Sequence, residues 1–152
     1  MEKNQLRELV RGTLIDLGFY SESALKLVLG TIAQESAGGY YIEQIKGPAR
    51  GICQMEPATF NWLVDGYLTK HKDVMQRIMK ICNIEDLNAQ TLRYNLKLSI
   101  CMCRVRYLVD PQPLPEPGNL EAIAGTWKRV YNTYKGAGTE KQFLKNYKKY
   151  VS

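Results

Sequence analysis

One glutamate stands where a carboxyl group can keep its proton near neutral pH. Glu35 ends an apolar, helix-like segment and comes just before Gly38 and Gly39, where the chain can turn away. The negative end of a helix dipole disfavours a carboxylate there, and apolar neighbours such as Ile32 do the same by desolvation, so both raise the pKa of Glu35. Such a group is suited to general acid catalysis, although a solvated surface glutamate fits the same position.

Two more blocks follow in the chain. They are Gly51-Ile52-Cys53-Gln54 leading into Pro57-Ala58-Thr59, and Tyr131-Asn132. With Glu35-Ser36 before them, they resemble the soluble lytic transglycosylase family, whose lysozyme-like fold cleaves peptidoglycan. Its pattern is a Glu-Ser at a helix end, a Gly-Leu-Met-Gln-like stretch leading to Pro-Ala-Thr, and an Ala-Tyr-Asn-like stretch on a late helix. The resemblance covers residues 24–139 and is closest to the small versions encoded by bacteriophages.

The resemblance implies a role for each block. Glu35 would be the sole general acid and base. It would protonate the glycosidic oxygen between N-acetylmuramic acid and N-acetylglucosamine, and then assist attack by the muramoyl C6 hydroxyl, which gives a 1,6-anhydro product. Ser36 would support positioning near the sugar or else bond to the backbone, and Gln54 would bind substrate or brace the loop. The Tyr131 hydroxyl would lie near the acid and help to orient it, unless Tyr131 is a core residue whose hydroxyl is satisfied elsewhere. Asn132 would contact the glycan or pin the late helix.

A second carboxylate would change the mechanism. A glycosidase that uses water needs a pair, about 5–5.5 Å apart for retention or about 6.5–9.5 Å for inversion. Glu56 is the candidate, and with it the protein would be a lysozyme-type hydrolase. Its place directly before Pro57, at the start of a helix, favours a capping role instead, because free backbone N–H groups and the helix dipole attract a carboxylate there.

Four aromatic residues could stack on sugars, since ring faces suit the apolar side of pyranose rings. We expect Tyr40 and Tyr41 to line the substrate cleft. Trp62 and Trp127 lie on helical apolar stripes, so we expect both in the core.

The elements that must position these residues are helical nearly throughout. Three–four spacing of apolar residues and capping residues predict helices over residues 6–17, 22–36, 57–64, 73–82, 89–109, 119–130 and 139–150. We expect the 89–109 helix to be the central, most buried one. Residues 40–56 carry turn signals and predict a long loop or a small β-hairpin. The sequence thus predicts one all-α domain over residues 1–152, with about six or seven helices, and the resemblance implies that it is lysozyme-like.

Composition and charge limit the partners. The 152 residues are 45% hydrophobic and 24% charged, as in soluble globular domains, and the net charge of +6 favours polyanions such as wall polymers or nucleic acid. The positive charge is spread along the chain without a recognisable reading helix, so no specific nucleic acid is expected. The expected partners are peptidoglycan glycan strands and other phage virion proteins.

No cofactor or metal is expected. The four cysteines show no CxxC spacing and there is one histidine, so we expect the cysteines to be small core residues in a reducing compartment. No segment is apolar enough to span a bilayer, and the N-terminal residues lack the apolar stretch of a secretory signal. Synthesis in the host cytoplasm, followed by action in the virion or at the host periplasm and cell wall, fits these features. A non-catalytic, wall-binding virion protein and a nucleic-acid-binding helical domain are the alternatives to an enzyme.

Overall fold

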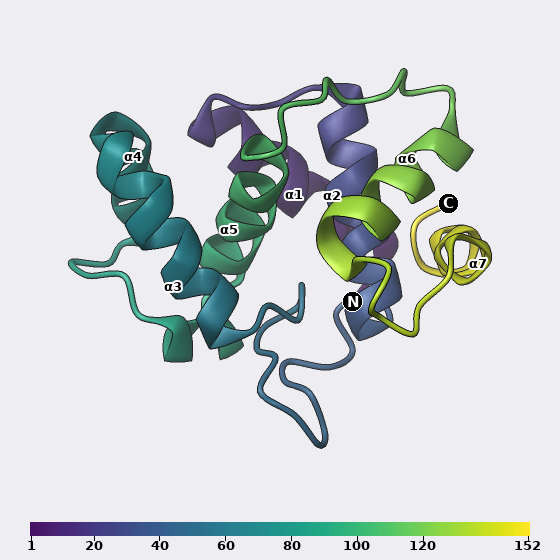
Figure 1. Cartoon of the computed structure of the whole chain (residues 1–152), viewed down its shortest axis with the longest axis horizontal. Helices are drawn as coiled ribbons and strands as arrows, with labels where there is room; N and C mark the ends of the chain where they lie inside the picture. The colour runs from purple at the N-terminus through teal and green to yellow at the C-terminus, as the bar shows by residue number, and fades with distance from the viewer.

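Seven α-helices dominate the computed structural model, which describes residues 1–152 (Figure 1). They are α1 (Lys3–Leu17), α2 (Glu22–Ser36), α3 (Pro57–Gly66), α4 (Lys72–Cys82), α5 (Leu96–Leu108), α6 (Leu120–Thr126) and α7 (Glu140–Tyr150). Two short 3-10 helices, η1 (Leu68–Lys70) and η2 (Ala89–Arg93), and a π-helix, η3 (Trp127–Asn132), complete them. The predicted all-α fold with about six or seven helices is confirmed. None of the helices combines the length and the apolar character needed to cross a membrane.

Capping residues set the helix ends as the sequence predicts. The Ser21 hydroxyl accepts the N–H of Ala24 at the start of α2, at 3.0 Å. Gly18 closes α1 in the left-handed conformation, with φ 85°. Thr139 and Gln142 form a capping box at the start of α7.

The predicted single helix over residues 89–109 is wrong. The chain forms η2, leaves the helical path at Tyr94 and Asn95, and starts again as α5. The Asn95 side chain accepts the N–H of Leu98 and donates to the carbonyl of Cys82, each at 3.1 Å. Asparagine competes with helical hydrogen bonds in this way and favours a cap over a helix interior. The expectation of a central helix still holds for α5, which is buried throughout residues 98–105.

The buried apolar residues form two clusters that share α5. One joins α1, α2, α6, η3 and α7, and the other joins α3, α4, η1 and η2. Figure 1 shows α3 and α4 on one side of α5, and α2, α6 and α7 on the other. Tyr131 packs against both clusters, so it lies at the seam between them.

The segment between α2 and α3 has no strand. Two isolated antiparallel bridges, Glu43 with Arg50 and Arg50 with Met55, tie it into a folded loop. Figure 1 shows this loop projecting from the helical body below α2 and α3. The sequence predicted either a long loop or a small β-hairpin for these residues, and the structure shows the loop.

The core positions predicted for the cysteines and for Trp127 are confirmed, whereas the one predicted for Trp62 is wrong. All four cysteines are buried and free, and Trp127 is fully buried, as predicted. Trp62 is not in the core, because 56% of it is exposed. The buried face of α3 is formed by Phe60 and Leu63, which leaves the Trp62 ring on the outside.

A pair of helical glycines tests the packing of α2 against α7. A Cβ on Gly30 would overlap the ring of Phe143, whereas a Cβ on Gly12 in α1 would meet nothing within 4 Å. Alanine gains about 1 kcal/mol over glycine in a helix interior, but overpacking a rigid core costs about 1–3 kcal/mol. We therefore expect Gly30→Ala to lower the free energy of unfolding in urea and Gly12→Ala to raise it. Equal effects of the two substitutions would contradict this packing.

Candidate active site

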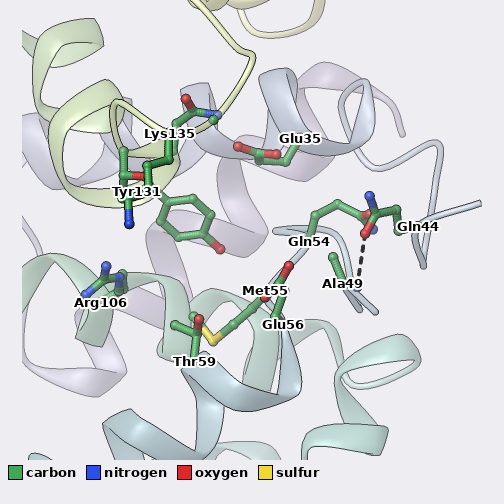
Figure 2. Close-up of a pocket in the computed structure, with 13 residues that line it drawn as sticks. Glu35, Gln44, Ala49, Gln54, Met55, Glu56, Thr59, Arg106, Tyr131 and Lys135 are labelled. Carbon is green, nitrogen blue, oxygen red and sulfur yellow. Dashed lines mark hydrogen bonds between the residues drawn. The ribbon is translucent and has the colours of Figure 1, made fainter. Parts of the chain in front are cut away.

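A cleft of about 620 Å³ opens where elements of both apolar clusters meet (Figure 2). Its walls come from the end of α2, the 40–56 loop, the start of α3, α5, η3 and the turn after η3. The lining residues are Glu35, Gln44, Ala49, Gln54, Met55, Glu56, Thr59, Arg106, Tyr131, Asn132, Thr133, Lys135 and Gly136. In Figure 2, the Glu35 carboxyl group lies between Tyr131 and Lys135 on one side and Gln54 on the other.

Glu35 keeps a partly shielded carboxyl group in this cleft. The turn after α2, where Ala37 has φ 53°, leads the chain away directly beyond it. Burial raises the pKa of Glu35 from about 4.5 to about 7, and a hydrogen bond from Trp127 acts in the opposite direction. No lysine or arginine forms an ion pair with this carboxyl group. The group can therefore exchange a proton near neutral pH.

Trp127 is the partner that fixes the acid. Its indole Nε1–H donates to Oε1 of Glu35 at 3.1 Å, although the two residues are 92 positions apart. The core position predicted for Trp127 is confirmed, but the apolar pattern gives no indication of this contact. The available signal was chemical, since a buried indole N–H usually has an acceptor.

Trp127 also begins the π-helix η3, which the sequence did not predict. A π-helix is rare and often marks a functional site. Here the same short element carries Trp127, which contacts the acid, and Tyr131, which lines the cleft.

Tyr131 lines the cleft together with Glu35 but makes no hydrogen bond to it. Its hydroxyl donates to the carbonyl oxygen of Cys53 at 2.7 Å, and its ring stacks on Tyr107 with the centroids 5.6 Å apart. This hydroxyl is thus satisfied by the loop and does not hold Glu35 through a hydrogen bond. Tyr131 instead fixes the chain segment directly before Gln54.

Gln54 lies beside Glu35 in a strained turn. Its backbone is in the left-handed region, with φ 49°, and its side-chain Nε2 donates to the carbonyl of Gly51 at 2.8 Å. The side chain thus braces the loop, which is one of the two roles expected for it, while it also lines the cleft.

Ser36 lies outside the cleft lining. It is fully buried, and its hydroxyl donates to Ile32 and accepts the N–H of Gly39, each at 3.0 Å. Of the two roles expected for Ser36, these contacts fit the backbone-bonding one and not a contact with the sugar. Ser36 secures the turn that follows Glu35.

Asn132 lines the cleft and belongs to a polar clasp. Its Oδ1 accepts a hydrogen bond from Lys128 at 2.7 Å, and the same ammonium group donates to the carbonyls of Gly136 and Gly138. The clasp holds the turn after η3 against the helix. This arrangement fits the expected role of pinning the late helix.

The second carboxylate, Glu56, also lines the cleft. It occupies the N-cap position of α3 as predicted, but its side chain makes no capping hydrogen bond and is exposed. The capping role favoured by the sequence is thus correct for the position of Glu56 but not for its side chain.

The two adjacent tyrosines differ. Tyr41 lines a smaller hollow of about 320 Å³ that also includes Glu35 and Gln54. Tyr40 is 74% exposed and lines neither hollow. Neither ring is thus part of the main cleft lining, and only Tyr41 lies in the smaller hollow that shares Glu35 and Gln54 with it.

Two cationic cleft residues, Arg106 and Lys135, had no signal in the sequence, because each comes from a segment without a recognisable motif. No group of three or more histidine, cysteine, aspartate or glutamate side chains converges to hold a metal ion.

Comparisons with protein-family models, with curated proteins and with solved structures found no match. The function must therefore be argued from the three sequence blocks and from the geometry of this cleft.

The raised pKa of Glu35 predicts a specific dependence of stability on pH. The folded chain holds this proton more tightly than the unfolded chain, so this group's contribution to stability falls as pH rises from about 4.5 to about 7. The variant Glu35→Gln cannot ionise and avoids this loss. Relative to wild type, its free energy of unfolding should gain about 3 kcal/mol between pH 4.5 and pH 8, measured by urea unfolding.

The matched control is Glu56→Gln, which changes a carboxylate of the same cleft. Because this side chain is exposed, its loss should change the free energy of unfolding at pH 8 by no more than about 0.5 kcal/mol. A stability difference between Glu35→Gln and wild type that stays constant across this pH range would contradict the buried acid.

Proposed function

We propose that this protein is a phage-type lytic transglycosylase that cleaves the β-1,4 bond between N-acetylmuramic acid and N-acetylglucosamine in peptidoglycan. One observation carries the proposal: Glu35 lies half-shielded in an open cleft, and burial raises its pKa to about 7. A carboxyl group with this pKa is present in both protonation states at neutral pH. It can therefore give up a proton and take one back within a single turnover.

The chemistry then needs no second carboxylate. Glu35 donates its proton to the glycosidic oxygen as the bond to the anomeric carbon breaks. The resulting carboxylate accepts the proton of the muramoyl C6 hydroxyl as that oxygen attacks the anomeric carbon. The product carries a 1,6-anhydro ring, no water is consumed, and Glu35 is protonated again.

The neighbouring residues support this step by fixing geometry. Trp127 holds one carboxyl oxygen of Glu35, which restricts its rotamer. Tyr131 fixes the segment before Gln54, and the clasp of Lys128 and Asn132 holds the opposite rim. Locking a reactive group through its neighbours' packing and hydrogen bonds is what keeps a site in its productive geometry.

As an enzyme of this kind, the protein has peptidoglycan glycan strands as its partner. It works at the host periplasm or cell wall, delivered with other proteins of the virion or released at lysis. Its fold is then lysozyme-like.

A specific observation favours a second mechanism. Glu56 is exposed, makes no capping bond and lines the same cleft as Glu35. In a lysozyme-type hydrolase, Glu56 would activate a water molecule or attack the sugar while Glu35 protonates the leaving oxygen.

Product analysis separates the two mechanisms. Purified protein should clear a peptidoglycan suspension, and mass spectrometry of the released muropeptides should show 1,6-anhydro ends. Glu35→Gln should lower the rate by about 10²–10⁴-fold, the usual contribution of general acid–base catalysis, and Glu56→Gln should remain active. Reducing ends together with an inactive Glu56→Gln would replace the transglycosylase with the hydrolase. A wild-type protein that binds peptidoglycan and clears none would leave only the non-catalytic wall-binding function.

The Trp127 bond predicts how the rate depends on pH. Because this N–H stabilises the carboxylate, its loss in Trp127→Phe should raise the pKa of Glu35 further. The acid form then persists to higher pH, so the alkaline limb of the kcat/KM profile should move upward from its wild-type position near pH 7. Phe143→Leu is the control, since it alters the ring beside Trp127 and keeps the donor. An equal shift in both variants would assign the effect to packing.

A further inference from the structure

A second hollow adjoins the cleft on the side away from the 40–56 loop. It measures about 280 Å³ and is lined by Ala58, Thr59, Trp62 and Arg106, which we call the Trp62 ledge. Thr59 and Arg106 also line the main cleft, so the ledge adjoins the cleft at these two residues. Ala58 and Thr59 come from the second sequence block, but neither Trp62 nor Arg106 belongs to any of the three blocks, and the proposed chemistry does not use the ledge.

Arg106 offers an unused cationic group on this ledge. Its guanidinium carbon lies 5.2 Å from the centroid of the Trp62 ring, and it takes part in no ion pair. The acid four residues further along, Asp110, is already held by Arg129 through two hydrogen bonds of 2.7 and 3.0 Å. No carboxylate lines the ledge itself. Because Arg106 takes part in no ion pair, its planar guanidinium group is suited to bidentate binding of a carboxylate.

Trp62 supplies an apolar surface beside this cation. More than half of it is exposed, and on another side it borders an apolar hollow of about 500 Å³ formed with Leu63, Tyr67, Leu108 and Val109 among others. The ring also restricts the guanidinium of Arg106 through a cation–π contact. A ligand that fits this ledge therefore combines a negative group with an apolar part.

We propose that the Trp62 ledge is a subsite for a carboxylate carried by a muramoyl unit of the bound strand. Arg106 binds the carboxylate, and Trp62 packs against the apolar part of the same substituent. This inference rests on the proposed function. Two groups share the required chemistry: the lactyl carboxylate of a muramoyl unit without a peptide, and the acidic residues of an attached stem peptide.

The test combines a change in the protein with a change in the substrate. Initial rates at low substrate give kcat/KM for intact peptidoglycan and for peptidoglycan whose carboxylates have been converted to amides. We expect about a tenfold loss from Arg106→Gln on the intact polymer and a similar loss from amidation with wild type, as for one charge-assisted hydrogen-bonded pair. Arg106→Gln assayed on the amidated polymer should lose no more kcat/KM than either change causes alone. Fully additive losses would overturn the assignment of Arg106 to the carboxylate.

Control variants separate the ledge from general charge attraction and from folding. Lys72→Gln removes an exposed positive charge at the start of α4 and should retain the full wild-type discrimination between the two polymers. Arg106→Lys keeps the charge but loses the bidentate fork, so it should discriminate less than wild type and unfold at a similar temperature. Equal effects of Lys72→Gln and Arg106→Gln would reduce the ledge to non-specific attraction.

A binding measurement keeps the subsite distinct from catalysis. Glu35→Gln should sediment with insoluble peptidoglycan, and adding Arg106→Gln or amidating the polymer should weaken this binding. If the wild-type protein binds according to the charge of the polymer but cleaves none of it, the proposed enzymatic function is refuted and the proposed subsite stands. Binding indifferent to both changes would refute the subsite alone. Strands stripped of their stem peptides distinguish the two sources, because only lactyl carboxylates remain on them.

Discussion

The site depends on keeping one carboxyl group away from water without giving it a cationic partner. Glu35 achieves this at the end of α2, where burial raises its pKa to about 7 and the Trp127 indole is its hydrogen-bond donor. An arginine or lysine in contact would lower this pKa and leave a permanent carboxylate. The neutral Trp127 donor holds the group in place and lowers its pKa, but burial outweighs this effect. Because the cleft has this single shielded acid, the elements that form its walls must hold fixed positions around Glu35.

The two apolar clusters provide those walls. Glu35 and Trp127 belong to elements of the first cluster, and the start of α3 belongs to the second. Tyr131 packs against both, and its hydroxyl holds the carbonyl of Cys53 on the loop between α2 and α3. One aromatic residue thus connects the helix that carries Trp127 to the loop that carries Gln54. This connection gives an irregular loop a fixed place beside the acid.

Local signals in the sequence predicted the helices and the role of Glu35 as an acid. The features that could not be predicted depend on contacts between residues far apart in the chain. Caps such as Ser21 and Thr139 act within three residues, so they can be recognised from sequence alone. The hydrogen bond from Trp127 to Glu35 joins residues 92 positions apart, and no spacing rule predicts it. The break at Asn95 was missed because the apolar pattern on both sides continues through it. The exposure of Trp62 depends on which face of α3 packs inward, and a sequence with apolar residues on several faces does not determine this.

The positions of the cations in the cleft follow the same electrostatic logic as the acid. Arg106 and Lys135 line the cleft, yet neither pairs with Glu35, whose raised pKa results from burial with Trp127 as the opposing influence. Arg106 is instead held over Trp62, in the hollow that both line with Thr59. In the proposed function, a cation placed there attracts the negatively charged strand without forming an ion pair that would lower the pKa of Glu35. The group proposed to bind negative charge is thus separate from the group proposed to carry the proton, although both lie in one small cleft.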